Sequence, residues 1–421
     1  MRVLSLFDGM ACGMIAMLGA GIEVDRYVAF EIDKYAIKTA THNFPMIEEK
    51  GDVFTADFTE YEGFDWLVGG SPCTYWSIAQ KNNRETEASG MGWELFQQYV
   101  RALHEAKPKY FIYENNKSMS KAIRASIDEA FGFEAVLINS ALVSAQNRQR
   151  LYWVGKRNPD GTYSKVNVEQ PIDRGILLKD VLDGKTNREK ARAVIGSIGR
   201  TTTREYFQKQ QNTMSFEPVI FQTERGFNKG GAKYEKSPTL TANAWEENNK
   251  VFEPVRIPEY GVDEKSRPII TAYSKRGTCE NQVKSNCFPD NPSKQLSDYI
   301  AEPVRAIPVE FDGDIPAKAI SQTDGKTYRV YKVENGIINI KDKDYPIKLA
   351  DGYYIIRKLT VSECKRLQTV PEWYEFPVSD SQSYKMLGNG WTCEVIIHLI
   401  KSCLAGKVDD EPEFKEQLKF F

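Results

Sequence analysis

The sequence predicts a doubly wound α/β fold with a mostly parallel sheet, together with a second, smaller β-rich domain. Short apolar runs, among them residues 3–7 and 66–69, stop at glycine or at an acidic residue, which is typical of buried parallel strands. Segments with helical spacing alternate with these runs, as in βα units. By contrast, residues 160–350 lack helical periodicity and are rich in Gly, Pro, Thr and Asn, which favours short strands and loops.

The amino-acid composition limits the classes of protein to which this chain can belong. The chain has 421 residues, of which 41% are hydrophobic and 27% charged, so it can bury a large core. No apolar run approaches the roughly 18 residues of a membrane span, and the N-terminus enters a strand without a signal-peptide pattern, so a cytoplasmic protein is expected. Seven cysteines without a CxxC pair, and only three histidines, argue against a disulfide framework, a metal site and a histidine-based catalytic centre. The net charge of −2 means that any basic surface must be local.

The first three βα units predict a nucleotide-like ligand. The turn 8–13 contains glycines that let a ligand approach the backbone, although it lacks the GxGxxG spacing and could be a plain tight connection. The next strand ends in Glu31, about 20 residues later, where a carboxylate can bind a ribose diol. The third unit ends in Gly51-Asp52. Together they fit an adenosine-containing cofactor, and the alternative is that Glu31 and Asp52 are ordinary surface acids.

The strand 66–69 predicts the position of a nucleophile. Gly69-Gly70-Ser71-Pro72 follows it and leads to Cys73, and ligands bind beyond the carboxyl ends of such strands. A lone cysteine is more often a small buried hydrophobe, so this observation needs support from other motifs. The polar segment 74–92, with Gly90 and Gly92 at its end, is expected to form a mobile loop over the site; surface disorder is the alternative.

Two further strands are expected to deliver polar groups to the same edge. The strand 110–113 ends in Glu114-Asn115, a carboxylate that can serve as a proton donor. A strand over 135–143 leads to Gln146-Asn147-Arg148-Gln149-Arg150. Residues two apart point to one face of an extended segment, so Arg148 and Arg150 are expected to face the same site.

This ordered set resembles the cytosine-5 DNA methyltransferases. Pro72-Cys73, Glu114-Asn115 and Gln-x-Arg-x-Arg carry the resemblance, and residues 4–9 and 69–73 are most similar to the de novo branch of that family. It resumes at Arg357 to Gln368 and at Leu387 to Trp391, so that residues 1–157 and 350–404 are covered. An ordered set of motifs is a far more specific signal than any one of them. The resemblance implies a prokaryotic or phage-type enzyme with its own target-recognition domain.

The resemblance also implies a reaction and its participants. The fold would be that of class I S-adenosyl-L-methionine-dependent methyltransferases, and a methyl group would pass from that cofactor to C5 of a cytosine flipped out of a specific duplex DNA sequence. Cys73 would form a covalent bond to C6, Glu114 would protonate N3, and Arg150 together with Arg148 would bind the carbonyl side of the base. The positions that match cofactor contacts are Phe7, Asp8, Gly9, Gly13, Glu31, Ile32, Asp52, Val53, Pro72, Asn389, Gly390 and Trp391.

The insert is expected to choose the DNA sequence. Residues 160–349 would form the target-recognition domain, and residues 1–159 and 350–421 the catalytic domain. Between Arg148 and Lys236 there are 18 Lys and Arg against 10 Asp and Glu, which suits a phosphate backbone, although a solvated charged face is the alternative. We expect a monomer, associated with the nucleoid through double-stranded DNA, and leave open a cognate restriction endonuclease. The expected DNA contacts are Ser77, Lys81, Gln146, Lys229, Lys233, Thr239, Thr241 and Asn243.

Three positions depart from the family pattern, and other functions stay open. Asn116 stands where valine is usual, Trp93 where arginine often follows the loop glycines, and Asn389-Gly390 differs from the de novo branch. One alternative is a cytosine-5 methyltransferase acting on tRNA, which the long basic insert disfavours. Another is a catalytically silent DNA-binding relative, which the intact motifs disfavour. A nucleotide-binding oxidoreductase is disfavoured because the glycine turn lacks GxGxxG.

Overall fold

The computed structural model describes residues 1–77, 84–183 and 323–405, together with short pieces between 191 and 321. The chain forms two compact units, whose boundaries fall near Val181 and Leu359. The sequence placed them at 159 and 350. The difference at the second boundary arises because strand β21 (Gly352–Lys358) hydrogen-bonds to strands β11 and β18 of the second unit, so the chain returns to the first unit only at Thr360.

The first unit contains an eight-stranded sheet that confirms the predicted doubly wound fold. The order is β3-β2-β1-β4-β5-β8-β6, with β9 beside β8. The pairs from β3 to β5 are parallel, whereas β8 runs antiparallel to β5 and β6. The strand order reverses between β1 and β4, where open α/β sheets bind their ligands. The strands are β1 (Arg2–Leu6), β2 (Arg26–Phe30), β3 (Glu48–Glu49), β4 (Trp66–Gly69), β5 (Tyr110–Asn116), β6 (Val136–Asn139), β8 (Gln149–Arg157) and β9 (Tyr163–Lys165).

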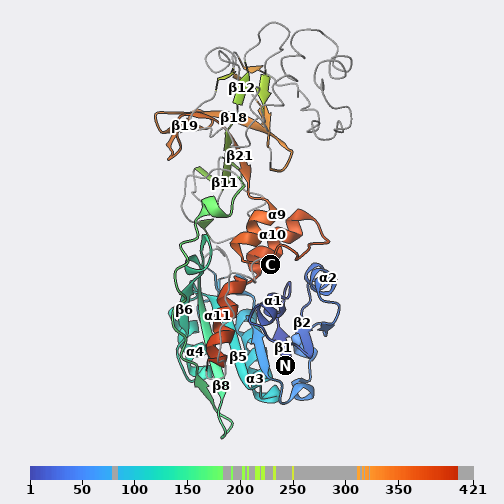
Figure 1. The fold of residues 1–421 in the computed structure, drawn as a ribbon. Coiled ribbons are helices and arrows are strands. Elements are labelled where there is room, and N and C mark those ends of the chain that lie inside the picture. The colour runs from blue at the N-terminus through green and yellow to red at the C-terminus, as the bar shows by residue number, and fades with distance from the viewer. Residues whose placement is uncertain are drawn as a thin grey trace, which may run out of the picture. The chain divides into compact units, whose positions relative to one another are not determined.

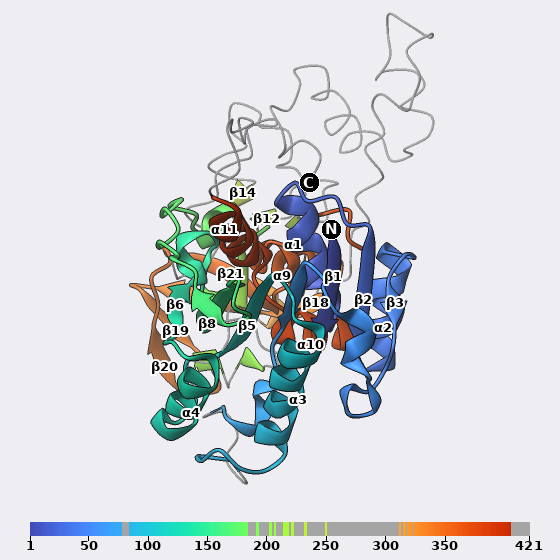
Figure 2. The ribbon, with the colours of Figure 1, turned by 90° about the horizontal axis from the view of Figure 1, so that it is seen from below.

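Helices cover both faces of this sheet. Figure 2 shows α1 and α11 on one face, and α3 and α4 on the other. Side chains of β1, β4 and β5 share one apolar core with α3 and α4, so the sheet is buried. Capping residues define several helix ends: Asp33 and Ser120 cap the starts of α2 and α4, and Thr360 forms a capping box with Glu363. The helices are α1 (Cys12–Gly19), α2 (Lys34–Asn43), α3 (Met91–Ala106), α4 (Lys121–Phe131), α9 (Val361–Leu367), α10 (Asp380–Asn389) and α11 (Cys393–Leu404).

The predicted strand over 135–143 is shorter than expected. β6 ends at Asn139, whose side chain accepts a hydrogen bond from the backbone N–H of Ala141 and so caps a short 3₁₀ helix, η4 (Ser140–Leu142). A two-residue strand, β7 (Gln146–Asn147), follows and pairs in parallel with β10 (Ala191–Arg192). Arg148 therefore lies between β7 and β8, whereas Arg150 lies at the start of β8.

The second unit is rich in strands, as predicted. Its largest sheet has the order β11-β21-β18-β19-β20, with β17 beside β18 (Figure 1). The hairpin between β18 and β19 turns at Asn335-Gly336, where both residues have positive φ, as in the tight turns that match the twist of paired strands. The strands are β11 (Met214–Pro218), β12 (Ile220–Gln222), β13 (Gly231–Lys233), β14 (Asn249–Lys250), β15 (Phe311–Asp312), β16 (Ile315–Pro316), β17 (Lys318–Ile320), β18 (Thr327–Glu334), β19 (Ile337–Asn339) and β20 (Asp344–Pro346).

In the parts of the chain that the structure describes, no helix is both long and apolar enough to span a bilayer.

Candidate active site

An ion pair between Glu114 and Arg150 lies where β5 ends and β8 begins. Arg150 Nε is 3.0 Å from Glu114 Oε1, and the side chains are only 16% and 11% exposed, respectively. The antiparallel register places Asn116 opposite Arg150 and Glu114 opposite Tyr152, so the backbone fixes the spacing of the pair. Two predicted site residues are thus brought together at the carboxyl end of β5.

The other oxygen of the same carboxylate is bound by Trp391. The indole Nε1 donates to Glu114 Oε2 over 3.0 Å. Trp391 lies in the short connection between α10 and α11, close to α1, since Cys12 Sγ lies 4.0 Å from its carbonyl oxygen. Both oxygens of Glu114 therefore have a donor, and the plane of the carboxylate is fixed.

The last residue of β4, Gly69, and the following Gly70 allow the cysteine loop to approach Glu114. A Cβ atom at Gly70 would lie 2.5 Å from the carbonyl oxygen of Glu114 and 3.2 Å from its Oε2. A Cβ atom at Gly69 would lie 2.5 Å from the carbonyl oxygen of Leu6. Real Cβ atoms do not come so close to backbone oxygens, so only glycine fits between β1 and β5 here. The Gly-Gly sequence thus serves close packing of the strand ends.

Cys73 begins a short 3₁₀ helix, η3 (Cys73–Tyr75), and its side chain is half-buried. Side chains at the end of β5 hold this loop: Asn115 Nδ2 donates to the carbonyl oxygen of Ser71 at 3.1 Å, and Asn116 Nδ2 donates to that of Cys73 at 3.4 Å. Asn116, a departure from the family pattern, thus contacts the thiol-bearing residue itself. No sequence pattern indicated that contact.

Part of the predicted lid is anchored. Glu85 accepts hydrogen bonds from the buried indole of Trp76 at 3.0 Å and from the backbone N–H of Gly92 at 3.2 Å. Arg84 donates to the carbonyl oxygens of Trp76 and Ser118. Arg84 and Glu85 are therefore tied to Trp76, to the start of α3 and to the residues that follow β5.

Arg148, for which the resemblance implied a contact with the base, binds carbonyl oxygens of the segment before Trp391. It is 3% exposed, and its guanidinium donates to the carbonyl oxygens of Gly388 at 3.2 Å and Gly390 at 2.7 Å. Burial lowers its pKa to about 10. Arg148 therefore supports the segment that presents Trp391, and its contact with the base stays a prediction.

Gln146 requires a similar correction. The sequence predicted a DNA contact, but the side chain is fully buried, and its Nε2 donates to the carbonyl oxygen of Leu367 and to Gln368 Oε1. Thr392 Oγ1 donates to the same Gln368 oxygen at 3.0 Å. These groups form a buried polar network between β7 and the segment 367–392, so Gln146 stabilises the fold of the first unit.

The first glycine turn and Glu31 form a cradle at the ends of β1 and β2. Gly9 N donates to Glu31 Oε2, while Oε1 accepts from the backbone N–H groups of Ile32 and Asp33, each at 2.8 Å. Phe7 and Gly9 both have positive φ, near 60°. A Cβ atom at Gly9 would meet no protein atom within 4 Å, so this turn faces open space that a ligand can enter.

Two acids beside this cradle have oxygens without a partner in the described structure. Asp8 Oδ1 accepts from Ser5 and Tyr27, but its buried Oδ2 is unpaired. Both carboxylate oxygens of Glu49 are likewise buried and unpaired. Burial raises the pKa of Asp8 to about 6, and burial together with the charges of Asp8 and Glu31 raises that of Glu49 to about 8. The sequence did not single out Glu49; its place in a short strand before Gly51-Asp52 was the only hint.

The other predicted cofactor contacts fall into two groups. Asp52 Oδ1 accepts from Phe54 N at 3.0 Å, Val53 is buried, and Ile32 is 77% exposed at the rim. Pro72 and Asn389 are exposed. By contrast, Gly13 and Gly390 serve packing: a Cβ atom at Gly13 would lie 2.6 Å from Tyr27 Oη, and one at Gly390 would lie 3.1 Å from Cys12 Sγ. Both glycines therefore fit elements around the cradle.

Most of the predicted DNA contacts cannot be placed. Lys81, Lys229, Thr239, Thr241 and Asn243 lie outside the described residues. Lys233 ends strand β13, of which only the backbone is described. Ser77 follows η3 and is half-buried.

A switch-point sheet with an open glycine turn, a half-buried thiol and a fixed carboxylate defines an α/β enzyme that binds a nucleotide-like cofactor. The family model described as C-5 cytosine-specific DNA methylase matches residues 1–405. The chain therefore belongs to the C-5 cytosine-specific DNA methylase family and is a DNA methyltransferase, as its motifs indicated. Enzymes of this family use S-adenosyl-L-methionine to methylate C5 of cytosine.

Relatives come from bacteriophages and bacteria, which agrees with a prokaryotic or phage-type enzyme. The chain is 26% identical to the orphan methyltransferase M.SPRI of Bacillus phage SPR, over 98% of this chain and 99% of the relative. It is 30% identical to the Type II methyltransferase M.FnuDI of Fusobacterium nucleatum, over 44% of this chain and 56% of the relative. Among solved structures, that of a Spodoptera frugiperda DNMT2 mutant is 14% identical, with 95% and 98% of the two chains covered and a TM-score of 0.48.

Proposed function

We propose that this enzyme methylates C5 of a cytosine that is flipped out of a specific duplex DNA sequence, through a covalent bond between Cys73 and C6. One observation carries the proposal: the Gly69-Gly70 turn brings the cysteine loop into contact with the end of β5, where Glu114 is fixed by Arg150 and Trp391. A base in a duplex cannot enter such a half-buried site, so flipping is required.

Cys73 and Glu114 carry out the addition step of the proposed reaction. The Cys73 thiolate adds to C6, and the electron pair of the C5–C6 double bond shifts to the C4–C5 bond. N3 takes up the displaced C4–N3 pair and a proton from Glu114, which donates in its protonated form. The resulting enamine has a nucleophilic C5. When bound, S-adenosyl-L-methionine supplies an electrophilic methyl group for C5. Loss of the C5 proton to a base then restores the double bond and expels Cys73.

Arg150 and Arg148 take different roles. Arg150 contacts Glu114 directly and is close enough to the carboxylate to bind the carbonyl oxygen of a base held there. Arg148 acts through the carbonyl oxygens of Gly388 and Gly390, so we assign it as a positioning residue for Trp391. The hydrogen bond from Trp391 then orients the carboxylate toward N3.

The cradle suits S-adenosyl-L-methionine, which carries a sulfonium, an ammonium group, a ribose diol and an adenine amino group. Acidic side chains surround the open turn, and Asp8 keeps a buried oxygen without a partner among the described residues. Glu31 would bind the ribose diol, Asp52 the adenine amino group, and Asp8 the cationic part. Ile32, Val53 and Pro72 would supply apolar contacts around them.

We assign sequence recognition to residues 160–349, with double-stranded DNA as partner, and propose that the enzyme works as a monomer. The excess of Lys and Arg between 148 and 236 supports this assignment. An endonuclease partner is not required by the proposed chemistry.

The decisive experiment offers the enzyme labelled S-adenosyl-L-methionine with a plasmid library and, separately, with tRNA. Methylated cytosines that share one flanking sequence in the plasmids are the expected result. Transfer to tRNA alone would favour an RNA methyltransferase, and absence of transfer to either would favour a silent DNA-binding relative.

A further inference from the structure

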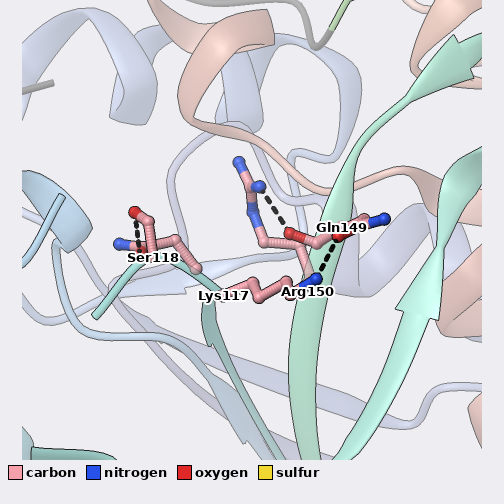
Figure 3. A pocket seen from close by; sticks show the side chains of 5 residues that line it. Lys117, Ser118, Gln149 and Arg150 are labelled. Atoms are coloured by element: carbon pink, nitrogen blue, oxygen red, sulfur yellow. Dashed lines mark hydrogen bonds between the residues drawn. The ribbon is translucent and has the colours of Figure 1, made fainter. Parts of the chain in front are cut away.

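A pocket opens beside the catalytic ion pair, between the end of β5 and the start of β8. It has a volume of about 340 Å³ and is lined by Asn116, Lys117, Ser118, Gln149 and Arg150. Figure 3 shows Ser118 on one side of the pocket and Gln149 and Arg150 on the other, with the Lys117 side chain reaching across to Gln149. This volume lies at the lower end of the range of small-molecule sites.

Two of the five lining residues, Lys117 and Arg150, are cationic, and none of the five is acidic. Lys117 Nζ donates to Gln149 Oε1 at 2.7 Å across the pocket, and no carboxylate in the described structure pairs with this lysine. Ser118 Oγ donates to Asn116 Oδ1 at 2.7 Å, so the walls are held in place by their own hydrogen bonds. The ammonium group of Lys117 retains donors for a ligand, since it has three and one reaches Gln149.

Arg150 connects this pocket with the catalytic site. Its Nε atom contacts Glu114, its Nη1 donates to the carbonyl oxygen of Gln149, and the side chain forms part of the pocket wall. In the proposed orientation Arg150 binds the carbonyl oxygen O2 of the base, and C2 is bonded to N1, which carries the sugar. The sugar and its phosphates therefore extend on the Arg150 side of the base. The pocket is thus a cavity into which the backbone of the target nucleotide can extend.

We propose that this pocket binds a phosphodiester that flanks the target cytosine, with Lys117 as the cation that faces it. This inference rests on the proposed function, because it takes the orientation of the base from Glu114. A phosphate contact at this point holds the flipped nucleotide in register without reading its sequence. The ligand is a DNA phosphodiester, and free phosphate is an outcome that the test distinguishes.

The first experiment measures how DNA affinity depends on salt for Lys117→Gln and for the control Lys109→Gln. Lys109 and Lys117 are exposed and lie immediately before and after the same seven-residue strand, roughly 25 Å apart at the usual rise of a strand. Loss of one phosphate contact should make the slope of log affinity against log salt shallower by about 0.9 for Lys117→Gln only. Equal slopes for wild type and Lys117→Gln would overturn the proposal.

The second experiment places a neutral methylphosphonate at single positions around the target cytosine, in the site found by mapping. Wild type should lose affinity at one flanking position, whereas Lys117→Gln should lose nothing further there. Equal losses in both proteins would overturn the assignment. Competition by millimolar inorganic phosphate with wild type, without any methylphosphonate effect, would point to a free anion instead.

These readouts separate the inference from the proposed function. Salt slopes can be measured on mixed-sequence DNA, even for an enzyme that transfers no methyl group. A shallower slope for Lys117→Gln without methyl transfer by the wild type would support the phosphate site and refute the proposed reaction. Methyl transfer by the wild type with an unchanged slope for Lys117→Gln would support the reaction and refute the phosphate site. Cofactor affinity and thermal midpoint should be the same in both lysine variants, since neither side chain is buried.

Discussion

Trp391 donates a hydrogen bond of 3.0 Å to Glu114 Oε2, although 277 residues separate them in sequence. The donor belongs to the segment that returns after the second unit, and the acceptor lies on a central strand of the first unit. Arg148 supports this donor through the carbonyl oxygens of Gly388 and Gly390. The orientation of the Glu114 carboxylate therefore depends on the first and the last stretch of the interrupted first unit.

Replacing Trp391 by Phe should reduce turnover by about tenfold or more, because a hydrogen bond to a charged group contributes about 1.5–3 kcal/mol. The measurement is single-turnover methyl transfer at saturating cofactor. Trp373→Phe is the control, since that side chain is 40% exposed and makes an edge-to-face contact with Phe44. Unchanged single-turnover rates in Trp391→Phe would show that the bond does not orient the acid.

Cys73→Ala should abolish methyl transfer and leave DNA binding intact, since only the covalent step needs the sulfur. DNA that carries 5-fluorocytosine at the target should form a denaturation-resistant complex with the wild type, because fluorine at C5 cannot leave as a proton does. The alanine variant should form none. Appreciable methylation by Cys73→Ala would rule out the mechanism.

Glu114→Gln keeps a hydrogen-bonding shape but removes the transferable proton. Turnover should fall by roughly 10²-fold or more, with little change in cofactor binding. Steady-state methyl transfer and cofactor titration test the two parts. A glutamine variant that turns over at the wild-type rate would exclude Glu114 from the chemistry.

Glu49→Gln should make the protein more stable than the wild type at pH 8. The gain in stability over the wild type should be smaller at pH 6. Burial raises the pKa of Glu49 to about 8, from an ordinary value of 4.5, and that of Asp8 to about 6. Between pH 4.5 and about pH 8 the folded protein keeps a proton on Glu49 that the unfolded chain has lost. The free energy of unfolding therefore falls as the pH rises toward 8. Denaturant midpoints at several pH values measure the effect.

Glu48 provides the matched control for this experiment, because it is the neighbouring residue in β3. Its carboxylate is hydrogen-bonded by Arg26, which lowers its pKa to about 2, so its contribution is complete above pH 4.5 and is lost only toward acid pH. Glu48→Gln should therefore shift the midpoint equally at pH 6 and pH 8. A Glu49→Gln protein with the same pH dependence as wild type would contradict the assignment.

Replacing Lys229 and Lys233 together should weaken binding to all DNA sequences and lower its salt dependence, as expected for phosphate contacts. Changes at Thr239, Thr241 or Asn243 should instead alter which site is methylated. Binding assays and mapping of methylated cytosines test the two effects. If these substitutions reduced only cofactor affinity, residues 160–349 would lose their role as the recognition domain.

The sequence by itself determined the parallel strands, the βα order, and the positions of Cys73 and Glu114 at strand ends. These features depend on local patterns: apolar runs bury strands, glycine ends them, and the carboxyl ends of parallel strands meet at one edge. The motifs assigned Glu114 and Arg150 to one site, but the ion pair between them was found only in the structure.

Only the tertiary structure decided the roles of Arg148 and Gln146, the boundary near Leu359 and the contact between Trp391 and Glu114. A two-residue alternation says that two side chains share a face, but not which distant segment covers that face. Here the segment 367–392 supplies the carbonyl oxygens that surround Arg148 and Gln146. The strand 352–358 joins the second unit because its backbone partners are β11 and β18. A hydrogen bond depends on the distance between two groups in space and does not depend on their separation along the chain. Local sequence patterns therefore cannot predict such partners.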